Sequence, residues 1–137
     1  MRFDHIGLFV SDLSHGRERL AALLPIVRFS EEFNDPLLHV RVQFCIDVSN
    51  ISYELVAPLG EDNPVSAVLA SGRNILNHIA YRVDSLEAAM ASLRKQGSLP
   101  IGPPAPAVAF GGARVAFFLT PLRFLIELIE DASADGV

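Results

Sequence analysis

Two histidines and two glutamates recur at one fixed spacing in the chain. His5 lies 73 positions before His78 (78 − 5 = 73), and Glu54 lies 73 positions before Glu127 (127 − 54 = 73). Imidazole and carboxylate groups together favour one borderline divalent metal ion, such as Co²⁺, Ni²⁺, Zn²⁺, Mn²⁺ or Fe²⁺. If the four side chains converge on such an ion, an octahedral shell keeps up to two positions open for water or substrate, which metal-ion catalysis requires.

Each of these residues alone has a simpler explanation. A histidine at the start of a strand is commonly a hydrogen-bonded structural residue, and a glutamate in an apolar strand can lie at an exposed edge. Burying a carboxylate without compensation is costly, so Glu54 in ISYELVAP and Glu127 in FLIELIE should be paired, protonated or metal-bound if they are buried. The common offset of all four residues favours the metal site.

The offset extends beyond these four positions and identifies an internal repeat. FDHIGLFV aligns with LNHIAYRV, HVRVQF with GARVAF, and YELV with IELI, without a gap. A repeat of this length predicts two equivalent structural units. We expect a single domain spanning 1–137, with module one at about 3–58, a connector at 59–74 and module two at about 75–131.

The apolar periodicity predicts the elements of each copy. In copy one we expect a strand at 3–10, a helix from 11 or 12 to 24, a short strand at 26–29, a polar loop at 31–36, and strands at 39–48 and 51–57. The connector should hold a short helix that begins at Asn63 and Pro64. In copy two we expect a strand at 75–83, a helix capped by Asp84 and ending near 96, an edge strand or a loop over the site at 100–106, strands at 113–119 and 123–130, and a loose tail at 132–137.

Alternation within the strands predicts which face the helices cover. The apolar rows Val40, Val42, Phe44 and Val115, Phe117, Leu119 are expected to lie under the amphipathic helices. The opposite, more polar face would then carry Gln43, Arg41 and Arg114, and two copies side by side would curl this face into a cleft. We therefore expect these three residues to bind substrate.

Composition narrows the classes of partner. The net charge is −5 and no basic cluster is present, which argues against a nucleic-acid partner. No apolar run approaches the length that a membrane-spanning helix needs, so we expect no membrane association. The single cysteine, Cys45, fits a reducing compartment, and we expect a cytoplasmic location.

These motifs resemble a known superfamily. DHIGLFVSDL, YELVAPLGEDNPV, LNHIAYRVDSLEAAMASLRKQG, RVAFFLTP and LIELIE are similar to the vicinal oxygen chelate superfamily (glyoxalase, bleomycin resistance and dioxygenase proteins) over about 3–130. The linker APLGEDNPVSAVL followed by NHIAYRV is most similar to its methylmalonyl-CoA epimerase-like branch. The resemblance implies an α+β fold of two tandem βαβββ modules, which form a curved mixed sheet with helices on the convex face around one divalent ion. It also implies that the metal ligands are His5, Glu54, His78 and Glu127.

The resemblance further implies a reaction. In this superfamily the metal chelates two substrate oxygens and stabilises an enediolate while an acidic residue moves the proton next to the carbonyl. Epimerases of the branch usually carry their catalytic glutamate where this chain has Leu37, and the usual lysine after the RVAF strand is missing. The catalytic candidates are therefore Glu127 and Glu54, and the substrate is an acyl-CoA or another carbonyl compound.

Several alternatives stay open at this point. One is a glyoxalase I-like lyase, and another is a non-catalytic protein of the same fold that binds a small molecule. A dioxygenase normally uses two histidines and one glutamate, so the fourth candidate, Glu54, argues against it. We expect a homodimer, and the ligands could converge within one chain or across two.

Overall fold

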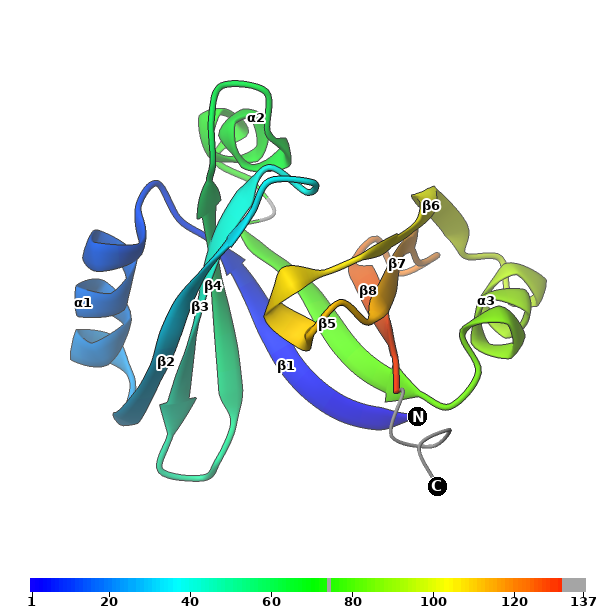
Figure 1. Ribbon diagram of the computed structural model, residues 1–137, viewed down its shortest axis with the longest axis horizontal. Coiled ribbons are helices and arrows are strands. Elements are labelled where there is room, and N and C mark those ends of the chain that lie inside the picture. Colours follow the sequence, from blue (N-terminus) through cyan, green and yellow to red (C-terminus); the bar gives the residue numbers. More distant parts are fainter. Residues whose placement is uncertain (74, 132–137) are drawn as a thin grey trace. The chain divides into compact units, whose positions relative to one another are not determined.

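The computed structural model describes residues 1–73 and 75–131, and the tail expected at 132–137 lies outside them. Within these residues the elements follow the order strand, helix and three strands, twice, with one helix in between (Figure 1). The first set is β1 (Arg2–Phe9), α1 (Leu13–Leu23), β2 (Ile26–Asp35), β3 (Val40–Asp47) and β4 (Ser52–Pro58), followed by α2 (Pro64–Ser71). The second set is β5 (Leu76–Val83), α3 (Leu86–Lys95), β6 (Leu99–Pro106), β7 (Arg114–Leu119) and β8 (Leu125–Glu130). The predicted pair of βαβββ modules is confirmed.

The strands form one mixed sheet in the order β2-β3-β4-β1-β5-β8-β7-β6, as the α+β prediction requires. The pairs β1/β4 and β5/β8 are parallel, and the remaining pairs within each module are antiparallel. The registers repeat along with the sequence. Glu54 lies beside Gly7 on β1, and Glu127 lies beside Ala80 on β5, which is again 73 positions later (80 − 7 = 73).

The chain divides into two compact units, and the boundary cuts through β1. One unit is His5–Asn77, and the other combines Met1–Asp4 with the chain from His78 onward. We refer to them below as the first unit and the second unit. Each unit has its own helix-covered core.

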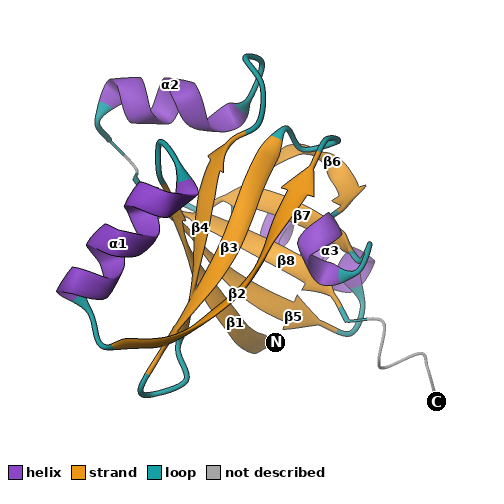
Figure 2. Cartoon of the chain, turned by 60° about the vertical axis from the view of Figure 1, so that its left-hand side comes forward, coloured by secondary structure: helices purple, strands orange, loops and turns teal. Residues whose placement is uncertain are grey.

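In the first unit, α1 covers one face of β3 and β4 (Figure 2). Asp12, one of the two start positions expected, caps the helix by accepting a hydrogen bond from the backbone N–H of His15. The core beneath the helix contains Leu13, Leu20, Cys45, Leu55 and Ala57. Burial raises the pKa of the Cys45 thiol to about 11, so this cysteine is a neutral core residue.

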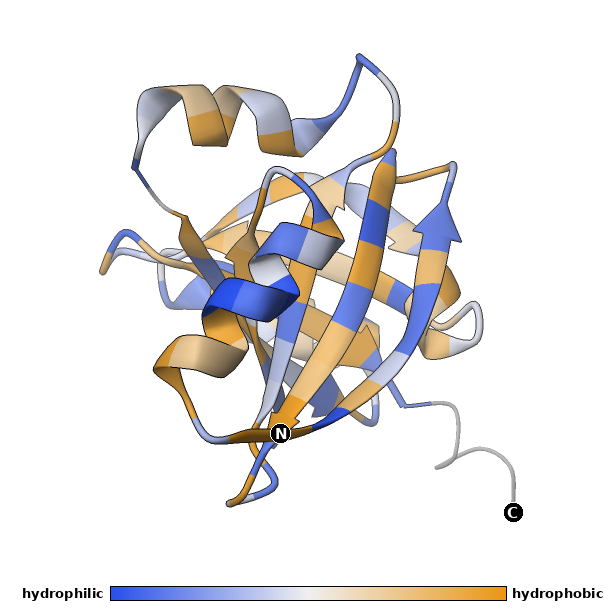
Figure 3. Ribbon diagram, turned by 90° about the vertical axis from the view of Figure 1, so that its left-hand side faces the viewer, coloured by the Kyte–Doolittle hydropathy of each residue, from blue (hydrophilic) through white to orange (hydrophobic). Residues whose placement is uncertain are grey.

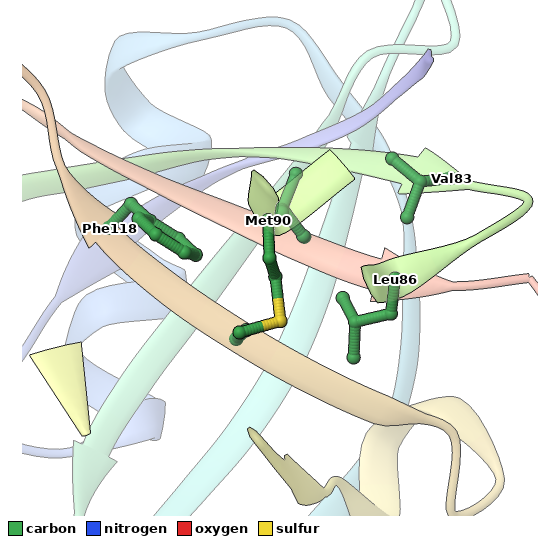
Figure 4. Packing of buried hydrophobic residues seen from close by; sticks show 6 residues of the cluster. Val83, Leu86, Met90 and Phe118 are labelled. Carbon is green, nitrogen blue, oxygen red and sulfur yellow. The ribbon is translucent and has the colours of Figure 1, made fainter. Parts of the chain in front are cut away.

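In the second unit, α3 covers β7 and β8. Leu86 and Met90 project from the helix onto the strands, where they pack with Val83 and Phe118 (Figure 4). The N-cap is Ser85, whose side chain accepts from the N–H of Ala88, so the prediction of Asp84 was wrong by one residue. No helix in the described residues is long and apolar enough to cross a membrane.

Two edge strands differ in how well the sequence predicted them. The prediction of a polar loop at 31–36 was wrong, because β2 continues to Asp35 and pairs with β3 around a bulge. Many residues of β2 are polar and exposed to solvent, because β2 lies at the edge of the sheet. Such an edge strand has the polar composition that is typical of a loop. The proline-rich segment at β6 is an edge strand, one of the two options expected, since proline is tolerated where no partner strand needs its N–H.

The prediction of which face the helices cover was wrong in both units. The alternation itself is present, and Figure 3 shows it as blue and orange bands along β3. The helix-covered cores, however, contain Cys45 in the first unit and Ala116 and Phe118 in the second. Val42, Phe44 and Phe117 therefore lie on the opposite face. Both faces of these strands are largely buried, so the alternation does not identify the helix-covered one.

The second core yields a stability prediction. Leu86 is fully buried, so Leu86→Ala should lower the free energy of unfolding by about 2–5 kcal/mol through lost apolar contact and a new cavity. Leu122→Ala removes the same atoms from a side chain that is 81% exposed, and it should change stability by less than about 0.5 kcal/mol. Urea unfolding monitored by circular dichroism measures both. Equal effects of the two substitutions would contradict this account of the core.

Candidate metal centre

The first unit brings His5 and Glu54 together. His5 Nε2 lies 3.3 Å from Glu54 Oε1, and the two side chains are 0% and 7% exposed. The parallel pairing of β1 with β4 produces this contact, because it places Glu54 beside Gly7, two residues after His5 on the same face of β1. The imidazole and the carboxylate therefore lie next to each other away from bulk water.

The second unit repeats this arrangement with His78 and Glu127. His78 Nε2 lies 3.2 Å from Glu127 Oε1, with side chains 3% and 4% exposed. The parallel pairing of β5 with β8 places Glu127 beside Ala80, two residues after His78. The internal repeat of the sequence is thus a repeat of side-chain geometry.

A phenylalanine accompanies each pair at the equivalent position. The ring of Phe44 meets the ring of His5 edge-on at 5.6 Å, and the ring of Phe117 meets that of His78 at 5.5 Å. Phe44 lies beside Glu54 on the neighbouring strand, as Phe117 lies beside Glu127. Each phenylalanine fixes the orientation of an imidazole ring and adds apolar surface next to a carboxylate. Sequence reasoning assigned both phenylalanines to the helix-covered face and missed this contact.

The chemistry of the donor set fits a divalent ion. Each of the four buried side chains offers one atom of a kind that binds metals, a ring nitrogen or a carboxylate oxygen. Buried carboxylates require compensation by positive charge or hydrogen bonds. Within each pair the Nε2 and Oε1 atoms are close enough to serve as neighbouring ligands of one ion. Two nitrogen and two oxygen donors suit Zn²⁺, Co²⁺, Ni²⁺, Mn²⁺ or Fe²⁺.

Gln43, expected to bind substrate, lies on the helix-covered side of β3. Its Oε1 accepts a hydrogen bond from Arg17 of α1 at 2.7 Å, and its Nε2 donates to the backbone oxygen of Ser30 at 2.8 Å. Gln43 is 6% exposed, and both ends of its amide make structural contacts. Its assignment to a solvent-exposed polar face is therefore corrected.

The two arginines expected to bind substrate share that side of the sheet. Arg41 is exposed and lines a cavity of about 280 Å³ with Ser11, Asp12 and Glu32, beside the first turn of α1. Arg114 donates to Glu130 at 2.8 Å and to Glu87 of α3 at 2.7 Å. Because these contacts lie on the side opposite the ligand pairs, we leave Gln43, Arg41 and Arg114 out of the proposed site.

The Arg114 cluster gives a pH-dependent prediction. Hydrogen bonds from Arg114 lower the pKa of Glu130 and of Glu87 below their ordinary values. A carboxylate with a lowered folded-state pKa stabilises the fold above its unfolded pKa, and this contribution disappears as the pH falls through the folded-state pKa. Arg114→Met should therefore reduce stability most at neutral pH, and the difference from wild type should narrow as the pH falls below about 4. A difference in melting temperature that stays constant from neutral to acidic pH would contradict this.

Comparison with known proteins agrees with the superfamily expected from the sequence motifs. The sequence profile of the Glyoxalase/Bleomycin resistance protein/Dioxygenase superfamily matches residues 4–117. The chain is 30% identical over 130 residues to the ethylmalonyl-CoA/methylmalonyl-CoA epimerase of Cereibacter sphaeroides, covering 94% of this chain and 95% of that protein.

Solved structures show the same similarity. The methylmalonyl-CoA epimerase from Mycobacterium tuberculosis superimposes with a TM-score of 0.76 at 26% identity, covering 99% of this chain and 92% of that one. A variant of the Streptomyces coelicolor methylmalonyl-CoA epimerase in complex with 2-nitronate-propionyl-CoA gives a TM-score of 0.77 at 25% identity, covering 98% and 96%. These proteins have the mixed sheet and the helices described above.

Proposed function

The chain belongs to the glyoxalase/bleomycin resistance protein/dioxygenase superfamily, and we propose that it is a divalent-metal-dependent isomerase acting on a malonyl-type acyl-CoA. The observation that carries the proposal is the pair of equivalent buried His–Glu contacts. The relatives named as methylmalonyl-CoA epimerases are enzymes, and their similarity covers nearly the whole chain. That similarity supports the acyl-CoA as the substrate class.

We propose that both His–Glu pairs bind one ion. His5, Glu54, His78 and Glu127 form a group of buried side chains that could hold a metal. The histidines would supply neutral nitrogen donors, and the glutamates would supply the negative charge that balances a divalent cation. When bound, such an ion supplies a fixed positive charge for the negative charge that develops on the carbonyl oxygen of the substrate.

The glutamates are the proposed proton carriers. The bond between hydrogen and the carbon next to the carbonyl breaks, its electron pair moves toward the carbonyl oxygen, and the proton goes to a carboxylate oxygen of Glu127 or Glu54. Returning a proton to the opposite side of the carbon inverts its configuration. Two glutamates from equivalent positions of a duplicated unit suit this task, because the ionised one can remove the proton while the other, once it has taken a proton from solvent, delivers it to the opposite side.

One observation favours a second candidate within the same chemistry. Leu37, at the position where related epimerases usually carry a glutamate, is 58% exposed in the turn between β2 and β3. It offers no group that exchanges protons. A glyoxalase I-like lyase, whose base is a glutamate of the metal site, also fits this arrangement, and the isotope experiment below separates it from an epimerase.

Metal content tests the four-ligand proposal. Wild-type protein purified without chelators should contain about one divalent ion per chain, measured by inductively coupled plasma mass spectrometry. His78→Ala removes one nitrogen donor and should lower metal affinity by about 10-fold or more. His15→Ala is the matched control, because His15 is exposed on α1 and should leave the metal content unchanged. Equal metal content in all three proteins would contradict the assignment.

Isotope exchange tests the reaction. In D₂O, the wild-type protein should exchange the hydrogen at C2 of methylmalonyl-CoA faster than buffer alone, as followed by NMR. Glu127→Gln cannot accept the proton and should slow exchange by about 100-fold or more, which is the usual contribution of a general base. The metal content of the variant must be measured in parallel, to separate loss of the base from loss of the ion. Wild-type exchange no faster than in buffer would exclude the epimerase and leave the lyase.

A further inference from the structure

The row of residues that contains His78 continues across the second unit as apolar side chains. Residues that are paired in neighbouring strands lie side by side on the same face of a sheet. His78 lies beside Leu125 on β8, and Leu125 lies beside Leu119 on β7. Leu99, on the edge strand β6, ends this row beside Leu119. The row therefore changes from an imidazole to three leucines on its way to the edge of the sheet.

The row that contains Glu127 ends in the same way. Glu127 lies beside Phe117, and Phe117 lies beside Ile101 on β6. Paired side chains have Cβ atoms about 5 Å apart, and the ring of Phe117 meets that of His78 at 5.5 Å. One aromatic ring therefore connects Ile101 to a candidate metal ligand. We refer to the five apolar side chains of the two rows as the apolar strip: Leu99, Ile101, Phe117, Leu119 and Leu125.

The outer end of the apolar strip is exposed to solvent. Leu99 is 62% exposed and Ile101 is 50% exposed, although both side chains are large and apolar. Neighbouring apolar side chains that remain exposed commonly mark a binding surface. The side chains of the strip carry no hydrogen-bonding group, and four of the eight residues of β6 are prolines, which have no backbone N–H. The strip therefore suits a hydrocarbon and offers little to a polar ligand.

The first unit does not repeat the apolar strip. Ser52 occupies the position that corresponds to Leu125 (125 − 52 = 73), and Ile46 corresponds to Leu119 (119 − 46 = 73). Ile46 lies beside Arg28 on the edge strand β2, where the second unit has a leucine. The same row of the same fold thus accommodates a serine and an arginine, so the fold itself does not require leucines there.

We propose that the apolar strip binds the hydrocarbon branch at C2 of a malonyl-type acyl-CoA, and that the protein accepts branches longer than a methyl group. This inference rests on the proposed function. The carbon that bears the branch is also the carbon that loses its proton, so the branch begins next to the proposed ligands. Neighbouring strands are about 4.8 Å apart, so the strip extends about 10 Å from β8 to β6, much further than a methyl group reaches. The pantetheine arm of CoA suits the strip less well, because its amide groups need hydrogen-bond partners.

The experiment compares thioesters that differ only in the branch. Isothermal titration calorimetry measures the affinities of methylmalonyl-, ethylmalonyl- and butylmalonyl-CoA for the metal-loaded protein, so the contribution of the CoA moiety cancels. A fully buried methylene raises affinity about 4-fold, and about 2-fold is expected on a half-exposed surface. The three additional methylenes of the butyl branch should therefore raise the affinity of wild type about 8-fold over that for methylmalonyl-CoA.

Two substitutions at exposed positions remove the outer part of the strip. The double variant Leu99→Gln with Ile101→Thr keeps side chains of similar size, and it should reduce the gain from methyl to butyl to about 2-fold or less while the affinity for methylmalonyl-CoA persists. Ile101→Thr alone should remove part of the gain. Leu23→Ser is the matched control, because Leu23 is 74% exposed on α1 and should leave the gain unchanged.

Three results would overturn the proposal. One is a wild-type affinity that does not rise with branch length, and another is the same rise in the double variant as in wild type. The third is an equal loss of affinity for all three thioesters in the double variant, which would assign the strip to the pantetheine arm. Sedimentation velocity of wild type and the double variant is measured in parallel. A dimer that dissociates on substitution while the dependence on branch length persists would assign the strip to an interface between two copies of the chain.

Failure of the proposed function gives a different result. If wild type binds none of the thioesters, the acyl-CoA assignment is wrong. The strip is then tested with methylmalonate and butylmalonate in the same proteins. A wild-type preference for butylmalonate that the double variant loses would support the strip without the CoA assignment, whereas equal affinities for the two acids, or binding of neither, would contradict the inference as well.

Discussion

A buried carboxylate next to a buried imidazole is the interaction on which each unit depends. Moving a carboxylate out of water carries a large free-energy penalty unless positive charge or hydrogen bonds compensate it. Both units place their glutamate on an inner strand, 3.2–3.3 Å from a histidine nitrogen and next to a phenylalanine edge. Such a pair is a poor choice for stability alone, because apolar residues of similar volume would fill the same space at lower cost. The arrangement is best explained by what the pair binds.

Parallel strand pairing produces this arrangement twice. A parallel pair fixes which residues of the two strands lie side by side, and the same register occurs at Gly7 with Glu54 and at Ala80 with Glu127. The helices stabilise the register from the other face, through Leu55 in one core and Leu128 in the other. The polar contacts on that side, between α1 and Gln43 and between α3 and Arg114, serve the same purpose.

The candidate ligands and the duplicated topology could be predicted from the sequence. When both copies fold alike, residues at a constant sequence offset occupy equivalent positions in the two units. The helix-covered face could not be predicted. Alternation shows that two faces differ, but on β3 and β7 one face is buried under a helix and the other is largely buried around the ligands. The second half of the outer strand β2 was predicted as a loop because its solvent-facing residues have the composition of a loop.

These differences show where reaction specificity is encoded in a duplicated fold. If the four residues hold an ion as proposed, they are constrained in both copies, so His5 and His78 or Glu54 and Glu127 identify the class of chemistry and not the substrate. A substrate with two different ends requires two different halves, and only positions free of the ligand constraint can diverge. Phe9 and Arg82 are such a pair, one apolar and one cationic, each a single row from its glutamate. The asymmetry of a substrate is therefore expected to be recognised at positions where the two copies differ, and its chemistry is better inferred from these positions than from those where the copies agree.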